Sequence, residues 1–339
     1  MVDPTLISRR TLFFVPFALA ACKDRTSIIE LVGSTMGTTY SIVAVDRSGT
    51  LSRSKIQSAV DGVFTDVNAQ MSNWDATSEV SRFNASRSAE AFPVSPDFAK
   101  VMAAAEEVHS LSDGHFDVTS GPLIELWGFG APASRTAPPS EVDIAAQMAS
   151  IGQSRHLEVG PNTLRKSNPE TEIYLSSIGK GFGVDAVGDA LRGLGIDDFM
   201  VEIGGDLLTA GLNPDGNSWQ IGIETPNLFD SSVQRVVAVS GQGLATSGDY
   251  RNYFESNGQR YSHILDAATG RPITHETASA TVITENAMLA DAWATAMLIL
   301  GSDTGRQLAD ALDLPVLFTD RDGDGFTTKA SARFDALAA

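Results

Sequence analysis

Cysteine is almost missing from this chain of 339 residues, which contains only Cys22. A single thiol cannot form a disulfide within the chain, so core packing must hold the fold together. Positive charge is also scarce, because the formal net charge is −18 at pH 7. This acidic balance argues against a nucleic-acid partner, since phosphate backbones attract clustered Lys and Arg. It equally disfavours electrostatic binding to anionic lipids.

Long apolar runs are missing too, and the longest candidate lies in an N-terminal targeting segment. Two arginines precede an apolar run over residues 12–21, which is shorter than the ~20 residues that span a bilayer. The run ends in Leu-Ala-Ala-Cys22, which resembles a bacterial lipobox. We therefore predict a signal peptide over residues 1–21 and a lipid on Cys22. A signal peptide that leaves Cys22 unmodified is the alternative, and residues 8–10 also resemble a twin-arginine export signal.

The remaining residues 22–339 have the periodicities of one large α+β domain. Alternating apolar residues predict paired strands over residues 26–45, and helical spacing predicts helices over residues 52–71 and after Ser95. Further segments read as strands over residues 171–175, 199–203, 207–211, 219–224, 236–240, 261–265, 279–284 and 315–319. Helices are expected over residues 181–194, around Asp291 and over residues 302–312. Strands in runs with flanking helices indicate mixed or antiparallel sheets and disfavour a doubly wound sheet.

Asp291 and Thr295 stand one helical turn apart, on one face of a helix whose other residues are mostly apolar. Two hard oxygen ligands on a buried face suit Mg²⁺, which points to phosphate chemistry. The alternative is a local hydrogen bond or helix cap. A buried carboxylate without a partner is costly, and this favours the metal site.

His263 and Lys180 are the other candidates for chemistry. His263 lies in the predicted strand over residues 261–265, just before Asp266 and a Thr-Gly turn, and is otherwise a core histidine. Lys180 stands among three glycines where a helix begins, a place that favours phosphate. The spacing is not that of a Walker A loop or of G-x-G-x-x-G, so a Gly-rich turn is the alternative. Gly204 and Gly205 mark a second place where backbone can approach a ligand closely.

A series of short motifs runs along the chain: Met36-Gly37-Thr38; Met71-Ser72 with Trp74; Ser78-Glu79 with Ser81-Arg82-Phe83-Asn84; Gly114 with Phe116-Asp117 and Thr119; Leu126-Trp127-Gly128-Phe129; Ile178-Gly179-Lys180-Gly181 with Val184-Asp185; Gly204-Gly205-Asp206; His263-Ile264-Leu265-Asp266 with Thr269-Gly270; and Ala290-Asp291-Ala292 with Ala294-Thr295. Each motif is weak alone, but their order along nearly the whole mature chain is specific. Together they resemble the ApbE family, the Mg²⁺-dependent FAD:protein FMN transferases.

The resemblance implies a T-fold-like domain with FAD in a cleft. It implies a ligand contact set consisting of Met36, Trp74, His115, Phe116, Asp117, Lys180 and Leu265. It also implies a Mg²⁺ ion held by the side chains of Asp291 and Thr295 and by main-chain oxygens near Ser177 and Ala294. The chain departs from the family pattern in three places: Tyr174 stands where Asp is usual, Ser176-Ser177 where Gly or Ala is often found, and Trp74 where Tyr or Phe is commoner.

The activity implied by the resemblance is transfer of FMN from FAD to a Thr or Ser hydroxyl of an acceptor protein, with release of AMP. His263 is the candidate base and Asp291 the candidate catalytic metal ligand, while Lys180 would pair with phosphate oxygens. The family suggests an exported subunit of a redox complex as acceptor and a lipoprotein anchored in the inner membrane, facing the periplasm. A Mg²⁺-dependent FAD pyrophosphatase and a non-catalytic flavin-binding lipoprotein are the alternatives.

Overall fold

The alternating apolar residues near the N-terminus form an antiparallel hairpin, as predicted. β1 (Ser27–Thr35) and β2 (Thr38–Asp46) pair along their whole length. Met36 and Gly37 turn the chain with φ of 50° and 75°, the left-handed backbone that two-residue hairpin turns require. The computed structural model describes residues 26–130, 137–227 and 232–337, so the predicted signal peptide and Cys22 lie outside the described residues.

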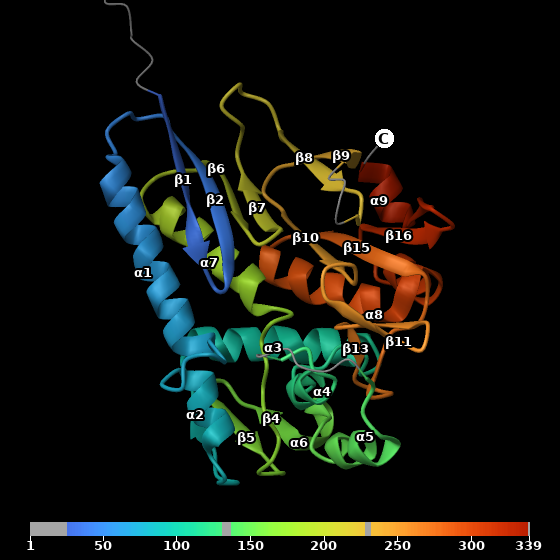
Figure 1. Cartoon of the computed structure of the whole chain (residues 1–339). Helices are drawn as coiled ribbons and strands as arrows, with labels where there is room; N and C mark the ends of the chain where they lie inside the picture. The colour runs from blue at the N-terminus through green and yellow to red at the C-terminus, as the bar shows by residue number, and fades with distance from the viewer. Residues whose placement is uncertain (1–25, 131–136, 228–231, 338–339) are drawn as a thin grey trace, which may run out of the picture.

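This hairpin is one edge of an eight-stranded sheet with the order β1-β2-β6-β7-β10-β15-β16-β17 (Figure 1). Every neighbouring pair in the sheet is antiparallel. The prediction of an α+β domain built on antiparallel sheets is therefore confirmed. The other strands are β6 (Asp198–Ile203), β7 (Asp206–Ala210), β10 (Gly243–Gly248), β15 (Thr277–Thr284), β16 (Val316–Asp322) and β17 (Gly325–Ala330).

Three long helices cover one face of the sheet. α1 (Arg53–Met71) and α7 (Gly179–Gly193) bury Ile56, Val60, Val184 and Leu191 against the strands of the β1 half. α8 (Ala287–Ala311) covers the β15 half, and α3 (Pro96–Leu111) packs beneath it in a second apolar cluster (Figure 1). Side-chain oxygens of Ser52, Ser95 and Asn286 cap the first turns of α1, α3 and α8. Among the described residues, no helix is long and apolar enough to span a bilayer.

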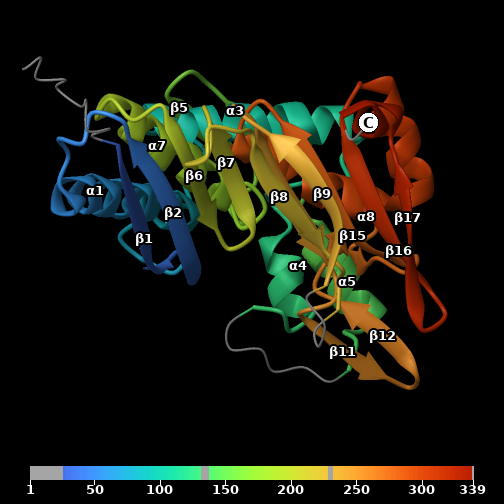
Figure 2. The ribbon, with the colours of Figure 1, turned by 90° about the horizontal axis from the view of Figure 1, so that it is seen from above.

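The other face of the sheet is covered by a hairpin and the last helix. β8 (Trp219–Glu224), β9 (Val233–Val239) and α9 (Ala332–Leu337) bury Trp219, Val237 and Phe334 there. β11 (Tyr253–Ser256) and β12 (Gln259–Ser262) form a projecting arm (Figure 2). The remaining elements are α2 (Glu79–Ala85), β3 (Phe92–Pro93), α4 (Gly121–Leu126), α5 (Glu141–Met148), α6 (Gln153–His156), β4 (Leu157–Val159), β5 (Thr163–Lys166), β13 (Leu265–Asp266) and β14 (Arg271–Pro272).

The helix around Asp291 and the predicted helix over residues 302–312 run together as α8. They meet at a kink at Gly301, whose φ of 72° and ψ of 169° are not helical. A Cβ at Gly301 would lie 2.8 Å from the His275 ring, so both the backbone angle and the space require glycine. The part of α8 before the kink packs on the sheet, and it carries Asp291 and Thr295.

Two predicted strands were wrong. Residues 171–175 belong to no strand. The side-chain amides of Asn73 and Asn84 bond the backbone of Ile173 and Leu175 instead. Side chains here take the place of a partner strand. The strand over residues 261–265 is interrupted at His263, whose N–H donates to the Asn252 carbonyl at 3.0 Å.

Candidate active site

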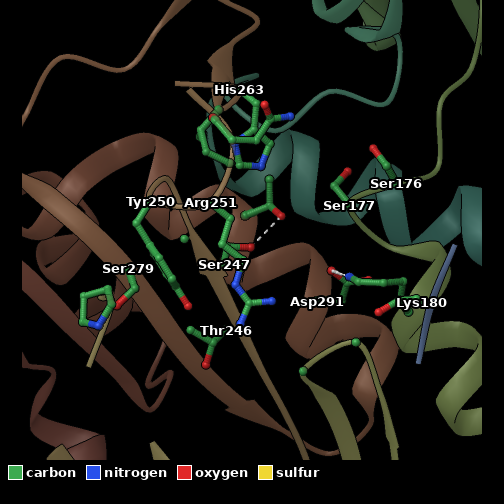
Figure 3. Close-up of a pocket in the computed structure, with 18 of the residues that line it drawn as sticks. Ser176, Ser177, Lys180, Thr246, Ser247, Tyr250, Arg251, His263, Ser279 and Asp291 are labelled. Carbon is green, nitrogen blue, oxygen red and sulfur yellow. Dashed lines mark hydrogen bonds and ion pairs between the residues drawn. The ribbon is translucent and has the colours of Figure 1, made fainter. Parts of the chain in front are cut away.

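A cavity of about 740 Å³ opens between the main sheet, β8 and the segment leading into α7 (Figure 3). Its volume is in the usual range for pockets that enclose small-molecule ligands. Sequence motifs that lie far apart in the chain meet in its wall. The predicted residues lining it are His115, Phe116, Asp117, Ser177, Lys180, His263, Leu265, Asp291 and Thr295.

A smaller compartment of about 300 Å³ adjoins this cavity. Met36 and Trp74 line it, while Tyr174, Lys180 and His263 line both compartments. The side chain of Trp74 is 77% exposed, so its ring is available for stacking on a flat ligand. Ala294 is fully buried in α8 and lines neither compartment, so its predicted main-chain contact with the metal stays a prediction.

Asp291 does not stand alone on an apolar face, contrary to the expectation from sequence. The Lys180 Nζ lies 2.7 Å from Asp206 Oδ2 and 3.4 Å from Asp291 Oδ1. Both carboxylates are buried, and the two acids share one ammonium group. Burial and the neighbouring Asp291 raise the pKa of Asp206 to about 8, against the attraction of Lys180. The ion pairs with both carboxylates outweigh burial and raise the pKa of Lys180 above its ordinary value.

Glycine allows this cluster to form where α7 meets α8. The Gly181 N–H donates to Asp291 Oδ2 at 3.1 Å. A Cβ at Gly181 would lie 2.2 Å from the Ala287 carbonyl oxygen, so any other residue would push the two helices apart. The Gly-rich segment thus brings a helix N-terminus against the Asp291 carboxylate, where its positive end favours negative charge.

Thr295 lies one turn after Asp291 and faces the sheet, where its Oγ1 is 3.0 Å from Ser247 Oγ. The carboxylate of Asp291 and these two hydroxyls are hard oxygen donors of the kind that Mg²⁺ prefers. Within the described ranges, no three His, Cys, Asp or Glu side chains gather closely enough to hold a metal ion. A single carboxylate with neutral oxygens still fits Mg²⁺, because this ion commonly completes its shell with water and substrate phosphates.

His263 is held in one tautomer by the backbone. Its Nδ1 lies 3.0 Å from the Asn252 carbonyl oxygen, which can only accept a hydrogen bond. Nδ1 therefore carries the proton, and no group of the described residues bonds Nε2, whose lone pair can accept another. Burial lowers the pKa of His263, so the ring is neutral at pH 7. These are the properties of a general base.

Three other predicted residues lie beside the cavity in a more structural setting. His115 Nδ1 lies 2.9 Å from Asp266 Oδ1. Phe116 is 1% exposed, and the Asp117 carboxylate accepts hydrogen bonds from Thr119 and from the Gln153 N–H. The oxygens of Asp117 thus already have hydrogen-bond partners. The predicted contacts of all three residues with FAD stay predictions.

Tyr174, the departure noted in the sequence, closes one side of both compartments. Its hydroxyl donates to Glu125 Oε1 at 2.6 Å, and burial together with that bond raises its pKa above the ordinary value. Its ring packs directly on Gly121, where a Cβ would lie 1.8 Å away. Tyr174 and Gly121 therefore fit each other.

Sequence reasoning missed the segment between β10 and β11. Thr246 and Ser247 at the end of β10 line the cavity, and so do Tyr250 and Arg251 in the segment that follows (Figure 3). Asn252 lines it too. The segment has no periodicity or glycine motif typical of a site. Its only signal is that polar and aromatic residues stand together shortly before His263. Asp206 was likewise noted only for the glycine pair before it, although its side chain is a partner of Lys180.

The chain is similar to proteins of known family over nearly its whole length. The sequence profile of the ApbE family matches residues 36–318. The FAD:protein FMN transferase of Vibrio cholerae is 43% identical over 316 residues, covering 93% of this chain and 94% of the relative. The FAD:protein FMN transferase of Escherichia coli is 36% identical over 320 residues, with coverages of 92% and 90%.

Solved structures give the same picture. The flavin transferase ApbE from Vibrio cholerae superposes with a TM-score of 0.85 at 41% identity, covering 92% of this chain and 99% of that one. The apo form of the flavinyl transferase ApbE from Pseudomonas stutzeri also has a TM-score of 0.85, at 36% identity, with coverages of 92% and 97%. The likeness therefore extends to the fold as well as to the motifs.

Proposed function

The chain belongs to the ApbE family, and on that premise we propose that it transfers FMN from FAD to a Thr or Ser hydroxyl of an acceptor protein and releases AMP. One observation carries the proposal beyond family membership. A neutral histidine with a free Nε2 and a carboxylate–hydroxyl pair suited to Mg²⁺ line the same cavity. A base and a charged phosphate site together are what transfer to a hydroxyl needs.

The reaction forms one bond and breaks one. The acceptor hydroxyl oxygen attacks the FMN-side phosphorus of FAD, and the bond from that phosphorus to the bridging oxygen breaks. The bridging oxygen leaves with its electron pair as part of AMP. His263 Nε2 accepts the hydroxyl proton, while Nδ1–H stays bonded to the Asn252 carbonyl. A base of this kind contributes ~10²–10⁴-fold in rate.

Asp291 and Thr295 would hold Mg²⁺, together with main-chain oxygens near Ser177 and Ala294. When bound, the ion supplies electrostatic stabilisation of the charge that develops on the phosphate oxygens. Lys180 adds a second positive charge at the helix N-terminus, and Asp206 orients its ammonium group.

A mass-spectrometric transfer assay tests the proposal. The purified domain would be incubated with FAD, Mg²⁺ and a candidate acceptor that exposes a Thr, and AMP would be measured in parallel. We expect the acceptor to gain the mass of one FMN, and EDTA to prevent this. Release of FMN and AMP without labelling of any acceptor would indicate the pyrophosphatase instead. Tight FAD binding with no AMP release would indicate a flavin-binding protein.

We propose further that the protein is exported and anchored through a lipid on Cys22, facing the periplasm, after removal of residues 1–21. The support is the lipobox-like sequence and the acidic charge, which leaves the lipid as the contact with the membrane. The acceptor would then be an exported subunit of a redox complex. Cys22→Ser should release the protein from the membrane fraction; retention of this variant there would contradict the lipid anchor.

A further inference from the structure

Arg251 is a cation of the cavity whose charge is not committed to the protein. It follows β10, lines the cavity and extends toward Thr246 (Figure 3). Across residues 26–130, 137–227 and 232–337, no hydrogen bond or ion pair reaches its guanidinium group. Its nearest aromatic neighbour is the Tyr250 ring, 5.6 Å from Cζ. Arg251 is exposed and is one of the residues that line the cavity.

The other basic side chains of the cavity wall differ from Arg251 in this respect. Lys180 is shared between Asp206 and Asp291. His115 is bonded to Asp266, and His263 is bonded to the Asn252 carbonyl. Glu202 and Glu224 add negative charge to the same wall. An anionic ligand that enters this cavity therefore meets one positive group that is free to bind it, within the described part of the chain.

The position of Arg251 is fixed by the residues on either side of it. Asp249 is 3% exposed, and its N–H donates to the Ala278 carbonyl. Arg260 and Arg321 hold its carboxylate, with Arg260 Nη1 at 2.6 Å. On the other side, the Asn252 carbonyl accepts the His263 N–H. A segment anchored at both ends presents its middle residue to the cavity with little loss of entropy on binding.

We infer that Arg251 binds the pyrophosphate of FAD through its guanidinium group. The inference rests on the proposed function for the identity of the ligand. Guanidinium donates paired N–H groups that match the geometry of phosphate oxygens, and it keeps its charge at every physiological pH. FAD brings two phosphate charges to a site that already holds more acidic than basic groups, so this cation offsets a repulsion that Lys180 alone does not.

Binding of three ligands to purified variants tests the inference. FAD and ADP carry a pyrophosphate, whereas riboflavin carries the flavin ring without phosphate. For Arg251→Ala we expect the Kd of FAD and of ADP to rise about ten- to hundredfold, the usual effect of losing a charged hydrogen bond. The Kd of riboflavin should stay within about twofold. Arg251→Lys keeps a point charge, so its Kd values for FAD and ADP should lie between those of the wild type and those of Arg251→Ala.

Arg235→Ala is the matched control, because Arg235 is exposed on β9 and lines neither compartment. It removes the same charge from the protein and should leave all three affinities unchanged. Equal losses of FAD and riboflavin binding in Arg251→Ala would overturn the inference and indicate a structural role. Normal FAD binding by Arg251→Ala would overturn it as well.

These measurements separate the inference from the proposed function. A wild-type protein that transfers FMN, with an Arg251→Ala variant that binds FAD normally, would retain the function and remove Arg251 from the site. A selective loss of FAD and ADP binding in a protein that labels no acceptor would retain the phosphate site and remove the transferase activity.

Discussion

Two clusters of charged side chains built on buried carboxylates lie in or beside the cavity wall, and they carry opposite excess charge. In the first, Asp206 and Asp291 share the single ammonium of Lys180. In the second, Asp249 alone is held by Arg260 and Arg321. Each acid is only 2–3% exposed, so water screens neither cluster well. The first cluster has two carboxylates for one ammonium group and can gain a second cation from a ligand or metal. The second cluster has two guanidinium groups for one carboxylate.

The difference separates a site from its scaffold. A buried group with an unsatisfied charge is costly, and binding a cation relieves that cost. A carboxylate surrounded by two guanidinium groups has all its oxygens used and gains nothing from a ligand. The second cluster acts on the site only by fixing residues 249–252, which carry Arg251 and the carbonyl that orients His263.

Removing the Asp291 carboxylate from the first cluster should have the largest effect on activity. For Asp291→Ala we expect FMN transfer to fall by ~10³-fold or more, because Mg²⁺ loses its charged ligand. In EDTA the variant should unfold at the same temperature as the wild type or higher, since Asp206 can then ionise and pair with Lys180 without a competing carboxylate. Transfer is measured by mass spectrometry and unfolding by calorimetry. Asp189→Ala, at an exposed position of α7, is the control. Near-normal transfer by Asp291→Ala would reject the metal assignment.

The link between the clusters is His263, and changing it should affect chemistry without affecting FAD binding. For His263→Asn we expect transfer to fall by about a hundredfold. Because the pKa of the wild-type ring is lowered, we expect the transfer rate to rise with pH as the ring loses its proton. The rate should approach its plateau at a lower pH than for an ordinary histidine, whose pKa is 6.5. The variant should show no such rise. His156→Asn, at a histidine outside the cavity, should keep the wild-type profile. If the transfer rate of His263→Asn still rose with pH as in the wild type, His263 would be excluded as the base.

Breaking the second cluster should have the opposite balance of effects to Asp291→Ala, with a larger loss of stability and a smaller loss of transfer. Asp249→Ala leaves Arg260 and Arg321 without their partner, and loss of one side of a buried pair costs about 3 kcal/mol in the free energy of unfolding. Urea unfolding measures this loss. Transfer should fall less than in Asp291→Ala, because no group that touches the substrate is removed. Unchanged stability of Asp249→Ala, or a loss of stability in Asp291→Ala of the same size, would erase the distinction between the clusters.

Local patterns predicted many of the elements and the motifs but not these charge pairings, and they missed β10 and β17. The hairpin of β1 and β2 and the helices after Ser52 and Ser95 follow from periodicity and capping, which depend on neighbours in sequence. The motifs placed His263, Lys180 and Asp291 in one site, and the cavity brings them together. The pairing of Lys180 with Asp206 depends on how α7 packs on β7, and nothing local signals it.

The other misses have the same origin. Residues 171–175 alternate like a strand, but the amides of Asn73 and Asn84 bond their backbone from about a hundred residues away. Arg251 stands in a segment without periodicity, and its importance appears only when the surrounding cations are found paired. Sequence patterns report which groups are present, while the excess of one charge at a site is set by the tertiary fold.

The smallest effect we predict is a pH dependence that tests whether the first cluster is short of positive charge. Burial and the neighbouring Asp291 raise the pKa of Asp206 to about 8 in the folded protein. Its ordinary value is 3.8, so between these values the folded state binds more protons than the unfolded state. The free energy of unfolding therefore falls as pH rises. We expect a fall of about 1 kcal/mol per pH unit between pH 6 and 8 in EDTA.

Asp206→Asn lacks the titrating group and should give a flatter curve over the same range. The range begins at pH 6 because the raised pKa of Asp185, about 6, adds a similar fall at lower pH. Urea unfolding of both proteins at pH 6, 7 and 8 measures the difference. Asp249→Asn is the matched control, since its two arginines leave no excess negative charge and its slope should equal that of the wild type above pH 6. If wild type and Asp206→Asn have the same slope, the two carboxylates are already balanced by Lys180, and the first cluster has no need of a further cation.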